Sequence, residues 1–307
     1  MNIVKMIADR LENKPLVSLD VKEEGKVYLH PSSAMVQTYD NKPLGACIRQ
    51  VYFDKIGAKE SNPVTSYNIM VTDSGNMWES WVIDRYKDLG IYLDNSIKLV
   101  DNTYNISCEL DILHKNFELG TVEVTEAKSY AGHNYQAVKE LLGSDTQAPK
   151  PKDQNLLQVV KYLLVLKRYG IEVVNLLYID RSASNYWNNK QFRVYLDSSD
   201  IYYSTFYKGQ WLDIRETRFD VNSILEKDQA LLQMLELKVA PPPDYHIQYT
   251  KEILEQEYIA GNVTKTNYQK VIKDEIPVTD LSSYNCRYCR YGKNKGTGEA
   301  TCLNYRD

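Results

Sequence analysis

The sequence of 307 residues predicts an α/β domain, and three observations support that prediction. Apolar and polar residues alternate through two runs around a Gly-containing turn, which is the pattern of a β-hairpin; the runs cover residues 104–114 and 122–129. A strongly amphipathic helix is predicted over 153–170. Strand-like runs follow it at 172–180, 191–196 and 201–206. Strands therefore precede and follow a long helix, as in an α/β domain.

Other periodic stretches predict further helices. One helix is expected over 75–89, closed by Gly90, with a buried stripe made of Met77, Trp78, Trp81, Val82 and Leu89. An amphipathic opening helix is expected over 3–13, and later helices over 220–238, 248–260 and 267–273. A polar, proline-containing link, 143–152, separates the hairpin from the long helix.

Charged side chains stand at the end of the predicted hairpin. The period of two places Val122, Val124, Glu126 and Lys128 on one side of the second strand. In the first strand Asp111 ends a polar face, opposite the face shared by Ile106, Cys108, Leu110 and Ile112. A charge withdrawn from water must be paired or bound to a metal, so Glu126 and Lys128 need a partner or a role.

Metal-dependent hydrolysis of a phosphodiester is one such role. Mg²⁺ takes oxygen ligands and commonly uses one or two carboxylates, which Asp111 and Glu126 would provide. Lys128 would then be a cation beside the attacking water and the phosphate. The alternative is an ordinary hairpin with a cross-strand Glu–Lys pair.

Composition narrows the class of protein. Hydrophobic content of 43% and charged content of 25% are typical of a globular protein. The net charge of −4 gives no general attraction to nucleic acid, so contact with DNA would need a local basic patch. No apolar run approaches a membrane span, and the first 20 residues lack the apolar core of a signal peptide, so we expect no membrane partner and a cytoplasmic location.

The chain has five cysteines, an odd number that argues against a disulfide framework. Cys108 lies on the apolar face of a predicted strand and is interpreted as a core residue. The others form a Cys-x-x-Cys pair, Cys286 and Cys289, with Cys302 nearby and Cys47 distant. Four thiolates suit either a tetrahedral zinc ion or a [4Fe–4S] cluster, and reduced cysteines in a loose tail are the plainer alternative.

The order of these motifs resembles the RecB-like branch of the PD-(D/E)XK nucleases, in particular iron–sulfur members related to the CRISPR-adaptation nucleases and the AddB-type nuclease domains. Gly75 and Glu79 match a G-x-x-x-[HE] element with the acid in place of the commoner His. Cys108 to Asp111 matches a G-x-x-D strand with Cys in place of Gly. The remaining matches are the E-x-K motif, Glu126-Ala127-Lys128, and the Q-x-x-x-Y motif, Gln158 and Tyr162. The resemblance covers about residues 30–302.

That resemblance implies a restriction-endonuclease-like core with a mixed central sheet flanked by helices. The core would occupy residues 61–240, and a helical and iron–sulfur cap would join an N-terminal segment, 1–60, to a C-terminal one, 241–307. The implied cluster is [4Fe–4S], not zinc, held by Cys47, Cys286, Cys289 and Cys302. The spacing from Cys289 to Cys302 is longer than the usual one, and its glycines suggest an insertion that loops out.

The resemblance also implies roles for the other motif residues. Asp111, Glu126 and Lys128 would be catalytic. Mg²⁺ or Mn²⁺ would be bound by Glu79, Asp111, Glu126 and the carbonyl of Ala127. Gln158 and Tyr162 fall together on the side of their helix opposite the leucine stripe, and we expect them to face DNA.

The expected function is a metal-dependent DNA nuclease, an exonuclease acting on single strands or DNA ends. The alternative is a binding module that keeps the fold and the cluster without cutting and serves in recombination or CRISPR interference. A zinc-stapled structural protein is a third hypothesis, which requires the hairpin acids to be incidental. The expected partners are DNA, a second copy of the chain, or a recombination or CRISPR protein.

Overall fold

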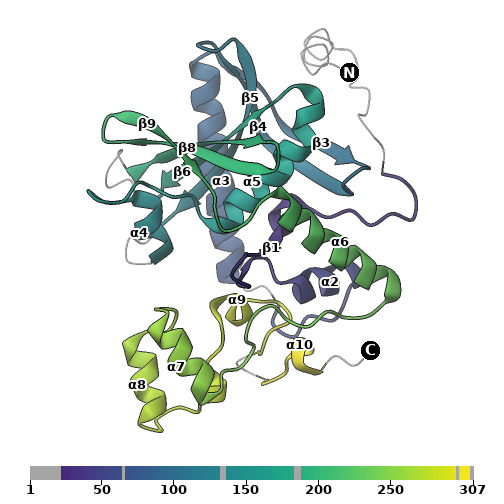
Figure 1. Ribbon diagram of the computed structural model, residues 1–307, viewed down its shortest axis with the longest axis vertical. Helices are drawn as coiled ribbons and strands as arrows, with labels where there is room; N and C mark the ends of the chain where they lie inside the picture. The colour runs from purple at the N-terminus through teal and green to yellow at the C-terminus, as the bar shows by residue number, and fades with distance from the viewer. Residues whose placement is uncertain (1–21, 64–65, 132–135, 183–187, 295–296, 305–307) are drawn as a thin grey trace. The chain divides into compact units, whose positions relative to one another are not determined.

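The computed structural model describes residues 22–63, 66–131, 136–182, 188–294 and 297–304 (Figure 1). The opening helix predicted over 3–13 lies outside them. The chain separates into two compact units: residues up to Gly45 with Tyr67–Asp228, and Ala46–Ser66 with Gln229–Asp307. The units are interleaved in sequence, whereas we expected three consecutive segments. Cys47 belongs to the second unit, with the C-terminal cysteines.

The first unit contains a seven-stranded sheet within the described residues, with its strands in chain order from β3 to β9. Its strands are β3 (Tyr92–Asp101), β4 (Ile106–Asn116), β5 (Thr121–Tyr130), β6 (Val173–Asp180), β7 (Lys190–Asp197), β8 (Asp200–Tyr207) and β9 (Gln210–Arg215). β5 and β6 pair in parallel, and the other neighbouring strands pair antiparallel. The sheet is therefore mixed, and the predicted hairpin is confirmed as β4 and β5.

The three strands predicted after the long helix are confirmed as β6, β7 and β8, but β3 and β9 were not predicted. β3 reads poorly as a strand because Asp94, Asn95 and Ser96 interrupt its alternation. Ser96 has a φ of 53°, and the register with β4 shifts between Tyr92 and Asp94. β9 is an edge strand whose residues are mostly exposed. A small hairpin of β1 (Met35–Gln37) and β2 (Pro43–Gly45) was not predicted either.

Helices are present at each predicted stretch within the described residues, although the helix predicted over 75–89 begins at Ser66. The described α-helices are α2 (Ile48–Ile56), α3 (Ser66–Asp88), α4 (Gln136–Leu142), α5 (Asp153–Leu166), α6 (Val221–Leu237), α7 (Lys251–Ile259), α8 (Lys265–Ile272), α9 (Tyr284–Arg287) and α10 (Thr301–Asn304). None of the described helices is long and apolar enough to cross a membrane.

The predicted buried stripe of α3 is wrong at several positions. Met77 is 74% exposed and Leu89, just beyond the helix, is 67% exposed. The face turned toward the sheet carries Trp78, Val82 and Tyr86, spaced four residues apart, which pack with Ile112 and Ile179. Hydrophobicity alone does not determine which apolar positions of a helix are buried. The surface against which the helix packs determines this.

Helix α5 is buried on nearly all sides. It lies in the connection between the parallel strands β5 and β6 and contacts β3, β4, β6 and β7 of the sheet as well as β2. The close approach of β2 requires Gly45, where a Cβ would lie 2.3 Å from the carbonyl oxygen of Ala34 and 2.8 Å from Cδ1 of Leu157. With a positive φ of 85°, Gly45 also has a backbone conformation that other residues rarely adopt. A helix covered in this way must bury polar residues too.

One of these is Lys161, which is fully buried and forms an ion pair with Asp228 of α6 at 2.6 Å. Lys161→Met should destabilise the first unit by about 3–5 kcal/mol, because it leaves a carboxylate buried and unpaired. The double variant Lys161→Met/Asp228→Leu should recover most of that loss. Denaturant unfolding of the three proteins measures this, with Arg85→Ala at an exposed pair as the control. A single variant as stable as the parent would contradict the prediction.

Candidate functional site

The candidate site lies where β4 and β5 diverge. The two strands pair from Ile112 with Thr125 to Asn116 with Thr121, and β5 continues beside β6 instead. Asp111 is the residue next to the last pair, and its Oδ2 accepts a hydrogen bond from the backbone N–H of Ala127 at 3.0 Å. A side-chain carboxylate thus takes the place of the carbonyl that a continued strand would offer.

The same divergence changes which way the residues of β4 face. Leu110 packs in the main core, whereas Ile112 packs in the cluster beneath α3. The prediction that Leu110 and Ile112 share a face with Cys108 is therefore wrong at Ile112. Asp111 lies at the point where the face changes, which the alternation in the sequence did not show.

Glu126 is the most deeply withdrawn acid of the site, with 1% of its surface exposed. Its Oε1 accepts hydrogen bonds from Nε2 of Gln158, at 2.6 Å, and from the ammonium of Lys128. Its Oε2 is buried and has no hydrogen-bond partner among the described residues. A buried carboxylate oxygen without a donor is costly unless something else satisfies it.

Gln158 and Tyr162 are brought to the site, but not on an exposed face. Only 5% and 1% of their surfaces are exposed, so the side of α5 opposite the leucine stripe is buried as well. Nε2 of Gln158 also contacts the Tyr162 hydroxyl at 2.8 Å, and that hydroxyl donates to the carbonyl of Glu109 at 3.1 Å. The pair connects α5 to both strands of the hairpin and holds Glu126 in place. Contact of these residues with DNA stays a prediction.

The charges of the site influence one another strongly. Burial first, and the charge of Glu126 second, raise the pKa of Asp111 well above its usual value. The same two causes raise the pKa of Glu79, which α3 carries to within electrostatic reach. Burial alone would lower the pKa of Lys128, but the charges of Glu126 and Asp111 outweigh it and raise that pKa. Acids thus outnumber the cation, and the imbalance favours a bound positive charge.

The donor atoms suit a hard divalent cation. Asp111 and Glu126 offer carboxylate oxygens, and the partnerless Oε2 of Glu126 is an acceptor for which the described residues provide no donor. No group of three or more His, Cys, Asp or Glu side chains in the described ranges, the cysteines of the second unit included, is placed to hold a metal ion as it stands. Water and substrate oxygens commonly fill the remaining positions around Mg²⁺.

The opposite face of β5 holds a polar cluster that the sequence did not reveal. Glu123 is 3% exposed and accepts hydrogen bonds from Asn116, Asn175 and Arg193 at 2.9, 2.7 and 2.8 Å. Burial works against its ionisation, but these donors lower its pKa overall. The cluster satisfies Glu123 fully, in contrast to Glu126 on the other face.

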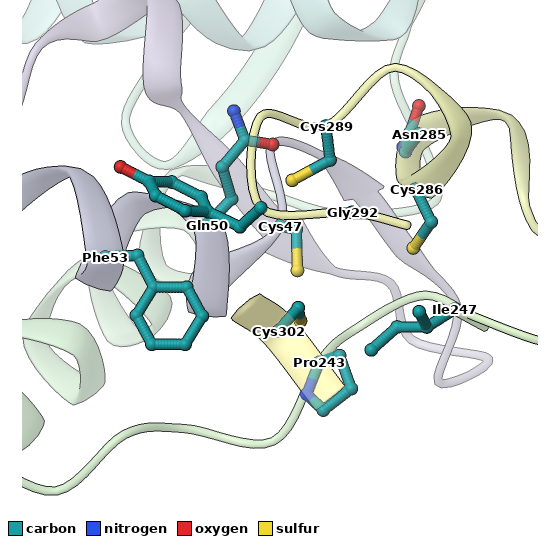
Figure 2. A pocket seen from close by; sticks show the side chains of 11 residues that line it. Cys47, Gln50, Phe53, Pro243, Ile247, Asn285, Cys286, Cys289, Gly292 and Cys302 are labelled. Atoms are coloured by element: carbon teal, nitrogen blue, oxygen red, sulfur yellow. The ribbon is translucent and has the colours of Figure 1, made fainter. Parts of the chain in front are cut away.

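The predicted cluster cysteines meet in the second unit. Cys47, Cys286, Cys289 and Cys302 line one cavity of about 10 Å³, and their side chains surround the same space (Figure 2). All four are free thiols. Burial, and after it the three neighbouring thiols, raise the pKa of Cys286. The structure therefore brings together the four cysteines that the sequence singled out and leaves Cys108 in the core of the first unit.

Backbone contacts explain how residues so distant in sequence converge. The N–H of Cys302 donates to the carbonyl of Tyr291 at 2.9 Å, so the long insertion between Cys289 and Cys302 folds back on itself. Gly292 is required in this turn, because a Cβ would lie 2.3 Å from the carbonyl oxygen of Cys286. Ser61 donates to the carbonyl of Gly292 at 2.9 Å and fastens the turn to the segment after Cys47.

Comparisons with known proteins add little. No protein family and no curated protein matches the chain. Among solved structures, an alkaline exonuclease (LHK-Exo) from Laribacter hongkongensis gives a TM-score of 0.35 and 16% identity over 62% of this chain and 78% of that chain. The structure of LHK-Exo in complex with dAMP gives a TM-score of 0.36 and 15% identity over 71% and 85% of the two chains. A likeness at these TM-scores supports no inference about the site.

The raised pKa of Asp111 predicts that its buried charge destabilises the metal-free protein. Asp111→Asn should stabilise the metal-free protein by about 1 kcal/mol at pH 8, because the amide keeps an acceptor for the Ala127 N–H without a buried charge. The gain should shrink as the pH falls toward about 4, because protonated Asp111 no longer bears that charge. Thermal unfolding in chelator across this pH range measures it. Glu109→Gln, at an exposed acid of the same strand, is the control, and an equal gain there would contradict the assignment.

Proposed function

We propose that this protein is a metal-dependent DNA nuclease that hydrolyses phosphodiester bonds, acting as an exonuclease on single strands or DNA ends. The observation that carries the proposal is the meeting of two carboxylates, Asp111 and Glu126, with Lys128 where β4 and β5 diverge. The buried carboxylates carry more negative charge than Lys128 can neutralise. Such a site suits a divalent ion and a phosphate bound to that ion. The PD-(D/E)XK motif order supports the same function.

Each residue of the site would have a separate role in hydrolysis. Asp111 and Glu126 would hold Mg²⁺ or Mn²⁺, with Glu79 as a further ligand and the carbonyl of Ala127 as a backbone one. A divalent cation bound there supplies positive charge against the phosphate oxygens. Lys128, whose raised pKa keeps it protonated, would orient the attacking water and offset the negative charge that builds in the transition state. Gln158 would act as a positioning residue, since it fixes the Glu126 carboxylate.

We also propose that Cys47, Cys286, Cys289 and Cys302 hold a [4Fe–4S] cluster, with zinc as the alternative. The support is the shared cavity, the Cys-x-x-Cys pair and the hydrogen bonds that draw the two cysteine-bearing segments together. A bound cluster would connect Cys47 to the C-terminal segment by covalent bonds through the metal. Its binding energy would then be folding energy for the second unit.

The catalytic assignment predicts distinct losses of activity. Asp111→Ala and Glu126→Ala should abolish cutting, because both remove an oxygen ligand. Lys128→Met should lower the rate at least about 100-fold while metal and DNA binding persist, because its charge acts mainly in the transition state. The assay is digestion of end-labelled single- and double-stranded DNA with Mn²⁺, Mg²⁺ or chelator.

The matched control is Lys98→Met, which removes an 80% exposed lysine from the neighbouring strand β3 and should leave the rate unchanged. Parental rates in both Asp111→Ala and Lys128→Met would remove the case for catalysis. A binding module that keeps the nuclease fold would then be the better reading.

The cluster assignment predicts colour and iron. Anaerobically purified protein should be brown and hold about four irons per chain. Cys286→Ser or Cys47→Ser should bleach it and lower its thermal stability, whereas Cys108→Ala should leave the iron content unchanged. Metal analysis and the visible spectrum of each variant measure this. Stoichiometric zinc without iron would contradict the iron–sulfur assignment and indicate a zinc site.

A further inference from the structure

A cavity in the second unit is lined by Cys286 of the cysteine segment and by polar residues that include two cations and one carboxylate. Its volume is about 390 Å³, within the range of small-molecule and nucleotide sites. The polar residues lining it are Asn267, Thr279, Asp280, Ser282, Arg287 and Lys293. Cys286 lines the same cavity, so the backbone that carries Arg287 is also the backbone of the cysteine site. We call this cavity the Arg287 pocket.

The positive charge of the Arg287 pocket is available to a ligand. Arg287 is exposed and has no carboxylate within ion-pair distance among the described residues. Lys293 contacts the Asp280 carboxylate at 3.3 Å, but both side chains are well exposed, and ion pairs of that kind are weak and easily exchanged. A guanidinium without a partner beside an exchangeable ammonium is an arrangement that a phosphate group matches.

Two tyrosines lie close to Arg287 in the sequence. Tyr284 and Tyr288 lie in and just after the short helix α9, and 71% and 61% of their surfaces are exposed. Their ring centroids are 5.0 Å apart, with the planes tilted by 54°. Exposed tyrosines in the segment that carries a pocket arginine provide surfaces on which unpaired bases stack.

We propose that the Arg287 pocket binds single-stranded nucleic acid, with a backbone phosphate between Arg287 and Lys293 and the adjoining bases on Tyr284 and Tyr288. The net charge of −4 means that such a strand must be recognised by a local feature of this kind. The proposal names the strand partner of the proposed nuclease, and in that respect it rests on the proposed function. The binding itself is a property of the second unit alone.

The test is binding of a fluorescent single-stranded oligonucleotide of about 20 nucleotides to the full chain, with its cysteine-bound metal retained, in buffer without Mg²⁺ or Mn²⁺ so that no cutting occurs. Arg287→Gln should weaken binding about tenfold and reduce the salt slope by about 0.7, the value for one lost phosphate contact. Tyr288→Leu should weaken binding about tenfold with the slope unchanged, because stacking releases no counterions. The control Lys270→Gln removes an exposed charge of the same unit outside the pocket and should bind like the parent.

Equal bound metal and equal thermal stability in each variant exclude disturbance of Cys286. Parental affinity in both Arg287→Gln and Tyr288→Leu overturns the proposal, as does a parent chain that binds no single strand or binds a duplex of the same sequence equally well. Arg287-dependent binding without any cutting would refute the nuclease and leave this inference standing. Cutting by the parent, together with unchanged binding in Arg287→Gln and Tyr288→Leu, would support the nuclease and refute this inference.

Discussion

The structure of the first unit depends on keeping a carboxylate out of water. Glu126 has almost no exposed surface, and only its Oε1 accepts hydrogen bonds, from the neighbouring Lys128 and from the amide of Gln158. Gln158 can reach it because α5, which connects the parallel strands β5 and β6 in the chain, packs against the sheet. The burial of α5 on nearly all sides, the glycine at β2 and the buried Lys161 pair all follow from that placement.

The divergence of β4 from β5 complements this constraint. A hairpin that stayed paired would use the Ala127 N–H in its ladder, and Asp111 would have no backbone donor to accept from. Because the strands separate there, the Asp111 carboxylate accepts a hydrogen bond from the Ala127 N–H, beyond the end of the ladder. The Glu126 carboxylate faces α5, and one of its oxygens has no donor among the described residues. The two faces of β5 show the contrast, since Glu123 is surrounded by donors while Glu126 is not. The buried oxygen of Glu126 that lacks a donor in the described ranges is where we propose that a divalent cation binds.

The second unit solves a different problem, that of bringing together cysteines far apart in sequence. The segment around Ser61 and Asn62 contacts the turn that carries Cys289 and Gly292, so that Cys47 reaches the C-terminal thiols. The segment that carries Cys286 and Cys289 also carries Arg287 of the Arg287 pocket and the exposed Tyr284 and Tyr288. A cluster bound by the four thiols would therefore also fix the surface that we propose for single strands, and stability and binding in this unit would be coupled.

The sequence by itself determined the hairpin, the long helix, the strands after it and the residue types of both sites, because alternation, helical periodicity and Cys-x-x-Cys spacing are local signals. It did not reveal β3, whose alternation Asp94, Asn95 and Ser96 interrupt, nor which side of α3 is buried. It set Gln158 and Tyr162 opposite the leucine stripe of their helix, facing DNA, and did not show that both are buried. Only the tertiary structure decided these points. Whether a polar residue of a helix meets water or a carboxylate depends on the surface packed against it, and residues far away in the sequence build that surface.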